Sequence, residues 1–551
     1  MSKLRIFPMG GIGKVTQNMY LYEYGNEILI VDCGIGFPDQ YMPGVDTIIP
    51  DINYLLRRLD EGKKIVGMVL SHGHDDHIAA LPYVLPDLPD FPIYASALTA
   101  RFADDRVKDK KVSKEVISLK DLQKKQIGSH FSVTLLAVTH SVPDAKHILI
   151  DTPVGVIYHG SDFKLDANPI DGILTDEKTI TDAGKKGVLA MLIDCLRVEK
   201  DEWIKSESTT GPAIASTIQN VRGRIYITLM SSHIHRIQQC IDLAVKMNRK
   251  VVLVGMSVEK NVRAVMDLNK LKVPNNILVK RKHINQHKDS DLLVIIAGSQ
   301  GQEGSSLVRA VYGEHTIQIK PQDIVVFSAR AIPGNEVPYY AAIDELSRNG
   351  IEVIYPDIAP DIHQSGHASK AELEHIVSLV KPKFVMPIGG ADRHRTRFKT
   401  KVAEPLGYKK DQILVPKYGQ VLEYDQGKFS VVKKINLKPR TVDGLGIGDV
   451  GPTVLQDRLA LSEAGMIVVV IPRFKGKIDY TKINIISRGF VFMREAESVI
   501  EFIKQTTEEI IKKAGKQNDN ELRRLIKVRL SKKLFKVIQR NPVIVPAFIN
   551  L

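Results

Sequence analysis

The chain has 551 residues, of which 44% are hydrophobic and 25% are charged. This composition is that of a globular protein with a sizeable buried core and about three domains. The formal net charge of +14 favours a polyanionic partner such as nucleic acid, because lysine and arginine release counterions when they neutralise phosphates.

The N-terminus, the apolar runs and the cysteines bear on localisation. No apolar run approaches the roughly 20 residues that span a bilayer. Residues 1–8 predict a short strand rather than a secretory leader. Cys33, Cys195 and Cys240 are too few for a disulfide framework and lack the spacing of a zinc knuckle, so we expect reduced thiols. We therefore expect a cytoplasmic protein with no membrane partner.

Short apolar segments alternate with turns over residues 4–205, which predicts two sheets flanked by helices, one of them over 52–59. The turn Gly10-Gly11-Ile12-Gly13 lacks the lysine and the following helix of a phosphate-binding loop, so we interpret it as a tight turn at the rim of a site. The expected strands span residues 19–24, 27–31, 65–70, 91–95, 133–138, 148–152, 156–158 and 188–193.

The motif His72-Gly73-His74-Asp75-Asp76-His77 follows the apolar strand 65–70 and precedes 78–82, where a helix is predicted to begin. Imidazoles and carboxylates are ligands that zinc accepts, and a turn lets neighbouring residues bind two different ions. The motif is therefore typical of a dinuclear metal site. The alternative is a polar surface loop with chance histidines.

Two later segments supply further ligands of the same kind. His140 follows the expected strand 133–138, and Asp162 follows the expected strand 156–158. Two metal ions bound at the first motif would still lack one imidazole and a bridging carboxylate. These segments therefore favour the metal site over the surface loop.

A domain boundary is predicted at residue 206, where the sequence becomes polar before a regular alternation of strands and helices begins. The alternation predicts a self-contained α/β unit with buried parallel strands, inserted into the first domain. Its expected strands span 225–229, 251–254, 292–297 and 324–327, and its expected helices span 235–247, 259–271 and 338–348.

The rest of the chain first returns to the sandwich and then, after a linker rich in glycine and aspartate over 436–451, forms a last segment. The final helix carries lysines and arginines on one face, which is either solvated or in contact with RNA. The expected elements are helix 370–380, strand 383–388, strands 466–471 and 483–488, and helices 495–513 and 520–539.

Together with Asp32, the histidine and aspartate motifs resemble those of hydrolases with the metallo-β-lactamase fold. Three further segments narrow the resemblance to the β-CASP nucleases and, within them, to the ribonuclease J family. These segments are Gly298-Ser299-Gln300-Gly301, residues 332–336 and residues 365–369. The resemblance extends essentially from end to end of the chain.

The resemblance implies an α/β fold: a metallo-β-lactamase αββα sandwich, an inserted β-CASP α/β domain and a small α+β C-terminal domain. The β-CASP domain is expected to close over the metal site and leave a channel for a nucleic acid strand. The C-terminal domain is expected to help the chain form a homodimer or homotetramer. The expected borders are 1–205 and 361–445 for the sandwich, 206–360 for the β-CASP domain and 446–551 for the C-terminal domain.

The metal ligands follow from the same comparison of motifs. The expected ligands are His72, His74 and His140 for one ion, Asp76 and His77 for the other, and Asp162 between them. Two zinc ions are expected, with Mg²⁺ or Mn²⁺ as alternatives. Such a pair lowers the pKa of a bridging water and stabilises both oxygens of a phosphodiester displacement, so the expected reaction is hydrolysis.

The expected catalytic residues besides Asp76 are Asp194 and His367, which match two further β-CASP motifs. A carboxylate paired with an imidazole near the leaving group could supply a proton. The alternative for His367 alone is a structural histidine.

A pocket for the RNA end is also implied by the resemblance. Ser232, Ser365, His367 and Ser369 would hold a 5′ phosphate, so the expected partner is single-stranded RNA with a 5′ monophosphate. Hydroxyls in a glycine-flanked turn are also ordinary turn chemistry, which is the alternative.

The chain departs from its apparent family in Pro387-Ile388-Gly389-Gly390, where the family usually has Pro-x-His-Gly. A glycine side chain cannot coordinate a metal, so the second site is expected to be weakened. His394 is a candidate replacement. Lys14 also stands where the family usually has an acidic residue.

The leading hypothesis is a metal-dependent ribonuclease, a 5′-3′ exonuclease with endonuclease capacity, in RNA maturation, including rRNA processing, and mRNA decay. One alternative is a DNA nuclease, since DNA-acting β-CASP enzymes also lack the final histidine. Another is a catalytically weakened RNA-binding subunit that partners an active paralogue, which Gly389 and Lys14 favour. The inserted domain disfavours a small-molecule hydrolase.

Overall fold

The structure is a computed structural model that describes residues 3–332, 334–444, 446–490, 496–515 and 517–551. Three positions used in the sequence analysis fall outside the described residues. They are Pro333 in an expected motif, Leu445 at an expected domain border and Glu495 at the expected start of a helix. The chain divides into two compact units, one of Met1–Phe37 with Ile48–Arg440 and one of Pro38–Thr47 with Thr441–Leu551. The expected borders between the domains of the first unit stay predictions.

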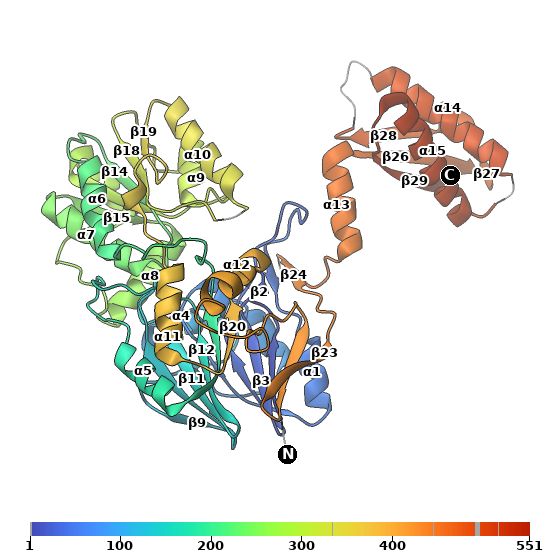
Figure 1. Cartoon of the computed structure of the whole chain (residues 1–551). Coiled ribbons are helices and arrows are strands. Elements are labelled where there is room, and N and C mark those ends of the chain that lie inside the picture. The colour runs from blue at the N-terminus through green and yellow to red at the C-terminus, as the bar shows by residue number, and fades with distance from the viewer. Residues whose placement is uncertain (1–2, 333, 445, 491–495, 516) are drawn as a thin grey trace. The chain divides into compact units, whose positions relative to one another are not determined.

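Two sheets form the centre of the first unit (Figure 1). The first runs in the order β23-β22-β1-β3-β4-β6-β7-β8 and the second in the order β20-β13-β12-β11-β10-β9. The strands of the first sheet are β1 (Leu4–Pro8), β3 (Tyr20–Tyr24), β4 (Glu27–Val31), β6 (Lys64–Val69), β7 (Ile93–Ala95), β8 (Val116–Ser118), β22 (Gln420–Asp425) and β23 (Lys428–Lys434). The strands of the second are β9 (Lys125–Ile127), β10 (Phe131–Ala137), β11 (Lys146–Thr152), β12 (Gly155–Gly160), β13 (Val188–Asp194) and β20 (Phe384–Ile388).

The two sheets pack face to face because both present apolar side chains to a shared core. Leu29 of the first sheet and Val133 and Ile148 of the second are fully buried in one cluster. Helices α5 (Glu177–Lys186) and α11 (Lys370–Val380) cover the other face of the second sheet. Helices α1 (Asn53–Asp60), α4 (Ala97–Asp109) and α12 (Asp392–Phe398) complete the outer layers. The expected αββα sandwich is confirmed.

The glycine-rich turn near the N-terminus packs against the segment that departs from the family. Strand β2 (Ile12–Gly13) pairs with β21 (Gly390–Ala391), and Gly389 donates a backbone hydrogen bond to Gly11 at 2.9 Å. Gly11 has φ +65°, a conformation that favours glycine. The interpretation as a tight turn is confirmed.

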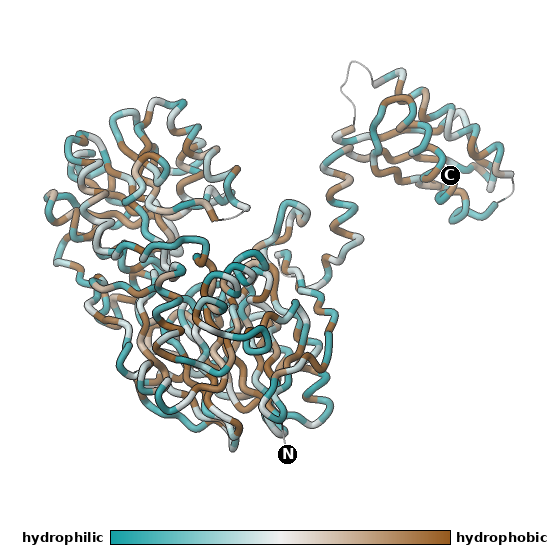
Figure 2. The backbone as a smooth tube through the Cα atoms, in the orientation of Figure 1, coloured by the Kyte–Doolittle hydropathy of each residue, from teal (hydrophilic) through white to brown (hydrophobic). Residues whose placement is uncertain are grey.

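The inserted unit has one parallel sheet in the order β16-β15-β17-β14-β18-β19, as expected from its apolar strands. Figure 2 shows hydrophobic segments running through these strands. The strands are β14 (Ile225–Thr228), β15 (Lys250–Val254), β16 (Leu278–Val279), β17 (Leu292–Ile296), β18 (Ile324–Phe327) and β19 (Glu352–Ile354). The helices are α6 (Thr210–Thr217), α7 (Ile234–Lys246), α8 (Met256–Asp267), α9 (Ser306–Val311) and α10 (Glu336–Arg348).

The second unit contains a sheet in which β26 lies between β28 and β29. Helices α14 and α15 bury apolar side chains against one face of this sheet. The sequence did not predict α13 or β29, and the expected linker contains the β24–β25 hairpin. Strands β5 (Thr47–Ile49) and β24 (Arg440–Asp443) span the borders of this unit in the sequence. The other elements are β25 (Gly446–Ile447), α13 (Pro452–Ala464), β26 (Met466–Phe474), β27 (Lys477–Ile478), β28 (Asn484–Arg488), α14 (Ala496–Ala514), α15 (Asp519–Ile538) and β29 (Val543–Asn550).

Two negative expectations can be compared with the described residues. Among them, no helix has the length and apolar character needed to cross a membrane. Cys33, Cys195 and Cys240 are buried free thiols, as expected.

Candidate metal centre

The histidine motif lies at the carboxyl end of β6, where the chain turns out of the first sheet. The structure has two short helices where the sequence predicted one beginning over 78–82. A single turn, α2 (Asp75–Ile78), begins inside the motif, and a separate turn, α3 (Leu81–Val84), follows. His72 and His74 therefore lie on the loop, whereas Asp76 and His77 lie on α2. Asp75 points to Arg106, with Oδ1 and Nη2 separated by 2.6 Å.

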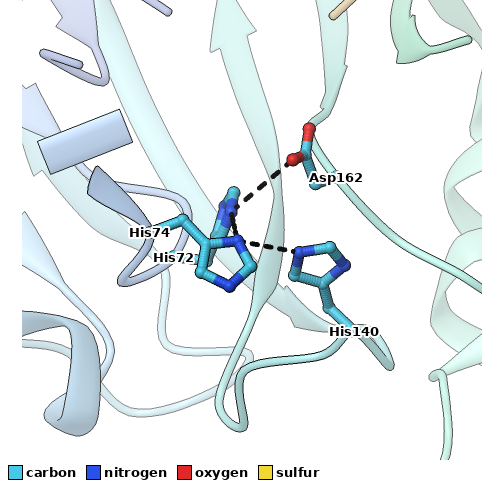
Figure 3. Close-up of side chains that lie close together, drawn as sticks. All are labelled: His72, His74, His140 and Asp162. Carbon is cyan, nitrogen blue, oxygen red and sulfur yellow. Dashed lines mark hydrogen bonds and ion pairs between the residues drawn. The ribbon is translucent and has the colours of Figure 1, made fainter. Parts of the chain in front are cut away.

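The first ligand group joins four side chains from three strand ends (Figure 3). His74 Nδ1 lies 3.2 Å from His72 Nε2 and 3.1 Å from His140 Nε2. Asp162 Oδ2 lies 3.7 Å from His72 Nε2. One ligand atom from each of the four residues lies within 4.8 Å of the others, so a single cation can contact them all.

Hydrogen bonds on the far side of the rings fix which nitrogen faces this group. His140 Nδ1–H donates to the Gly366 carbonyl at 2.7 Å, which leaves Nε2 as an acceptor. His72 Nδ1 pairs with the Ser71 hydroxyl at 3.0 Å. Partners of this kind orient metal-binding imidazoles and raise their basicity.

The second ligand group consists of Asp76, His77 and Asp162. His77 Nε2 lies 3.6 Å from Asp76 Oδ2 and 3.5 Å from Asp162 Oδ2. His77 Nδ1–H donates to Asp32 at 2.7 Å, so Nε2 faces the group. Asp32 also accepts from the Ser71 amide and hydroxyl, which agrees with its expected supporting position.

The charge states of three imidazoles, those of His72, His74 and His140, suit a metal site. Burial lowers the pKa of His72 and of His140 well below the ordinary value, and lowers that of His74 to about 3. These three rings are therefore neutral at pH 7, as imidazole ligands must be. Burial would also lower the pKa of His77, but the carboxylates of Asp162 and Asp76 raise it instead.

The acidic side chains respond to burial in different ways. Burial raises the pKa of Asp76 to about 6. For Asp162 burial acts in the same direction, but the positive charges of His77 and His367 hold its pKa well below the ordinary value. Asp162 is thus the carboxylate that most readily carries a negative charge between the two groups.

Asp194 and His367 form a pair beside the same carboxylate. His367 Nδ1 lies 2.8 Å from Asp194 Oδ2 and 3.9 Å from Asp162 Oδ2. Burial opposes the charge of His367, but Asp194 and Asp162 raise its pKa to about 9. The structure therefore brings together these two sequence-predicted residues, whereas their catalytic roles stay predictions.

The serines expected at the RNA end have unequal surroundings. Ser365 is half-buried, and its Oγ accepts from the His367 amide at 3.1 Å. Ser232 is half-buried in the turn between β14 and α7. Ser369 is fully buried and caps α11, its Oγ accepting from the Glu372 amide at 3.4 Å. The structure therefore assigns a helix-capping contact to Ser369, and its contact with RNA stays a prediction.

Gly389 and His394 differ in their relation to the centre. A Cβ at Gly389 would lie 3.2 Å from Asp194 Oδ1 and 3.7 Å from Asp162 Oδ1, so a side chain there would enter the centre. His394 instead accepts from the Ala391 amide at 3.3 Å, and its Nε2 lies 3.6 Å from Glu199. Within the described residues, His394 belongs to none of the ligand groups.

Besides Ser71, which binds His72 and Asp32, sequence reasoning missed two contributors. Asn18 is buried, and its Nδ2 lies 3.1 Å from His77 Nε2. The Gly366 carbonyl accepts a hydrogen bond from His140, although the two residues are 226 positions apart in the sequence. A lone buried asparagine and a backbone carbonyl carry no residue pattern that could have revealed them.

A sandwich of two sheets with a metal-ligand motif at a strand end, interrupted by a parallel α/β unit, defines the class of metallo-β-lactamase-fold enzymes. Family models agree: "Metallo-beta-lactamase superfamily" matches residues 12–200, "Ribonuclease J, beta-CASP domain" matches 222–346, and "Ribonuclease J C-terminal domain" matches 453–551.

Whole-length relatives carry the identification further. The chain is 34% identical to ribonuclease J of Thermus thermophilus, over 99% of this chain and 95% of that protein. It is 31% identical to ribonuclease J2 of Bacillus subtilis, over 100% of this chain and 99% of that protein. The chain belongs to the ribonuclease J family and is therefore a metal-dependent ribonuclease.

A solved structure supports the fold alone. It is a protein of unknown function from Enterococcus faecalis, with a TM-score of 0.54 and 16% identity over 77% of this chain and 100% of that chain.

Proposed function

We propose that the chain hydrolyses RNA phosphodiesters as a 5′-3′ exonuclease with endonuclease capacity. The supporting observation is that Asp162 belongs to all three groups of ligand atoms found in the described part of the chain: with His72, His74 and His140, with Asp76 and His77, and with Asp194 and His367. One carboxylate thus links a candidate metal site, a second site and an acid-base pair. RNA maturation and mRNA decay are the corresponding cellular roles.

The residues fit divalent metal, because the first group presents neutral imidazoles and a carboxylate at mutual distances that one ion can bridge. His72, His74, His140 and Asp162 would hold one ion. Asp76, His77 and Asp162 would hold another. Zinc suits this donor set best, and the carboxylates also admit Mn²⁺ or Mg²⁺. Bound ions would lower the pKa of a water and stabilise the phosphodiester oxygens.

His367 would hold a proton at Nε2 for the leaving oxygen. Asp194 binds the opposite ring nitrogen at 2.8 Å, so it fixes the orientation of the ring. Asp194 itself accepts from the Leu196 amide at 2.8 Å, which anchors the carboxylate. The pair therefore consists of an imidazole that can donate a proton and a carboxylate that orients it, as general acid catalysis requires.

The RNA end would bind near the same loop. Ser365 and His367 adjoin the metal centre, and Ser232 precedes His233. Burial lowers the pKa of His233, and the charge of Arg236 lowers it further. Hydroxyls and amides of this kind suit a terminal phosphate on single-stranded RNA.

Two features favour the weakened-subunit alternative, the absence of a side chain at Gly389 and the basic residue Lys14. The intact first ligand group and the His367–Asp194 pair oppose it. A homodimer or homotetramer is part of the same proposal, by analogy with the family.

Chelation and substitution test the proposed chemistry. Chelation should abolish cleavage of a 5′-labelled RNA, and Asp76→Ala should reduce the rate by at least about 100-fold, since a ligand of the second group is lost. The matched control is Asp75→Ala, because the adjacent Asp75 faces Arg106 and lies outside the ligand groups of the described residues. Undiminished cleavage by folded Asp76→Ala protein would contradict the proposal.

The RNA end gives a separate test of exonuclease action. An unstructured RNA with a 5′ monophosphate should be degraded faster than the same RNA with a 5′ triphosphate, because the triphosphate is bulkier and more charged. Internal cuts should respond less. Equal rates of terminal degradation, followed on gels of doubly labelled oligonucleotides, would count against the end pocket.

A further inference from the structure

Arg236 lies in α7 and is fully buried where the inserted unit joins the sandwich. Burying a guanidinium is unfavourable unless its donors are paired. The partners of Arg236 come from both crossings between the two parts: Glu207, where the chain enters the inserted unit, and residues 363–364, where it returns.

All N–H donors of Arg236 have acceptors. Nε and Nη2 donate to the two oxygens of Glu207 at 2.8 and 2.7 Å. Nη1 donates to the Ser328 carbonyl at 2.7 Å and to His363 Nδ1 at 2.8 Å, and Nη2 donates to the Gln364 carbonyl at 3.2 Å. The carboxylate thus holds the planar guanidinium on one side, and the returning loop binds to its other side.

The same loop makes two contacts with the metal centre a few residues later. The Gly366 carbonyl accepts from His140 Nδ1–H at 2.7 Å, and His367 pairs with Asp194 at 2.8 Å. The first contact sets the tautomer and ring orientation of a metal ligand. The path from Arg236 to the ligand therefore consists of Gln364, one serine and the Gly366 carbonyl.

We infer that Arg236 is a positioning residue of the metal centre. By holding His363 and Gln364, it places Gly366 and His367 against the sandwich and couples the seating of the inserted unit to the orientation of His140. A lysine cannot reproduce this function, because its single ammonium cannot pair with Glu207 in bidentate fashion and also reach both loop acceptors. Only the expected effect on RNA cleavage rests on the proposed function.

The test compares Arg236→Lys with Arg249→Lys in the full chain. Arg249 is also a buried arginine of the inserted unit, but it donates to the carbonyls of Gly223, Leu292 and Val221, which lie in that unit. In a zinc competition with a chromogenic chelator, Arg236→Lys should lower the affinity of the tighter site by about 10- to 100-fold. Arg249→Lys should leave it unchanged, even if its thermal stability falls.

Two further readouts separate positioning from general destabilisation. Hydrogen exchange over 362–369 should accelerate in Arg236→Lys and not in Arg249→Lys. With a short RNA, kcat should fall while KM stays within about twofold, since the loss concerns the transition state rather than RNA binding. If the unmodified protein cleaves no RNA, the proposed function fails but the zinc measurement still decides the inference.

Unchanged zinc affinity in folded Arg236→Lys, or an equal loss in Arg249→Lys, would overturn the inference. If Arg236→Lys does not fold, His363→Leu replaces it, because this change removes one loop acceptor and leaves the Arg236–Glu207 pair intact. The expected result is a smaller loss of zinc affinity in the same direction, and no loss would overturn the inference as well.

Discussion

Gly389 occupies the position from which a side chain would enter the metal centre. Its missing Cβ points to Asp194 and Asp162, at 3.2 and 3.7 Å. Its φ of +65° disfavours most L-residues, although histidine is among those enriched there. The second ligand group consequently has one imidazole, that of His77, and two carboxylates, so we expect it to fill only at a higher metal concentration than the first.

Restoring an imidazole tests this interpretation of the second site. Gly389→His should raise metal content toward two ions per chain and shift the metal-activation curve for RNA cleavage to lower concentration. Gly389→Ala is the matched control, because it carries the same backbone strain, about 1–2 kcal/mol, without a ligand. Elemental analysis and activity titration measure both. Two tightly held ions in the unmodified protein, unaffected by Gly389→His, would show that other groups already complete the site.

Sequence patterns located the candidate metal ligands, which the structure brings together, because ligand chemistry restricts residue type. His72, His74 and His77 fall in one short motif, and His140 and Asp162 each follow an apolar strand. The contacts that orient them were not predictable, since they depend on tertiary structure: Asn18 reaches His77 from the loop before β3, and Gly366 contributes only a backbone carbonyl.

Helix α11 shows how one serine can serve structure where the sequence suggested substrate binding. Ser369 and Glu372 form a reciprocal capping box at its N-terminus. Glu372 is fully buried, and its other contacts include the amides of Leu165 and Ile204. Glu372 therefore both closes the start of the helix and binds two other segments of the sandwich, at Leu165 and at Ile204.

A pair of substitutions separates the cap from the RNA end pocket. Ser369→Ala should lower the free energy of unfolding by about 1 kcal/mol, the usual effect of removing an N-cap, and should preserve the preference for a 5′ monophosphate. Ser365→Ala should leave the free energy of unfolding nearly unchanged and should reduce the preference for a 5′ monophosphate. Thermal denaturation and terminal degradation rates measure the two effects. Loss of the 5′ preference in Ser369→Ala with unchanged stability would support the original substrate-binding prediction instead.

The buried strands were predictable because β-branched runs leave few alternatives: β4 and β18 have the expected bounds. Strand β29 was missed since Pro546 interrupts its pattern, and proline is tolerated there because β29 is at an edge of its sheet. Helix α13, which follows the glycine-rich linker, was missed because its sequence has no regular apolar face.

A short N-terminal segment belongs to the unit formed by the end of the chain. Residues 38–47 group with 441–551, although they follow β4 closely in sequence. The Asp46 amide donates to the Val442 carbonyl at 2.9 Å, and the Gly444 amide donates to Asp46 Oδ2 at 2.8 Å. Arg458 of α13 donates to the Pro43 carbonyl at 3.0 Å and also binds Asp443. The C-terminal unit is therefore built from two distant parts of the sequence.

Arg458→Met should loosen this segment without affecting the metal centre. The side chain of Arg458 is about one-third exposed, so its ion pair is partly screened. We expect hydrogen exchange over 38–47 to accelerate by about tenfold, which corresponds to roughly 1.4 kcal/mol, with zinc content unchanged. The control is Arg440→Met, because Arg440 belongs to the first unit and pairs with Asp87 of the same unit at 2.7 Å. If both variants, or neither, accelerate exchange over 38–47, Arg458 does not tie the segment to the C-terminal unit.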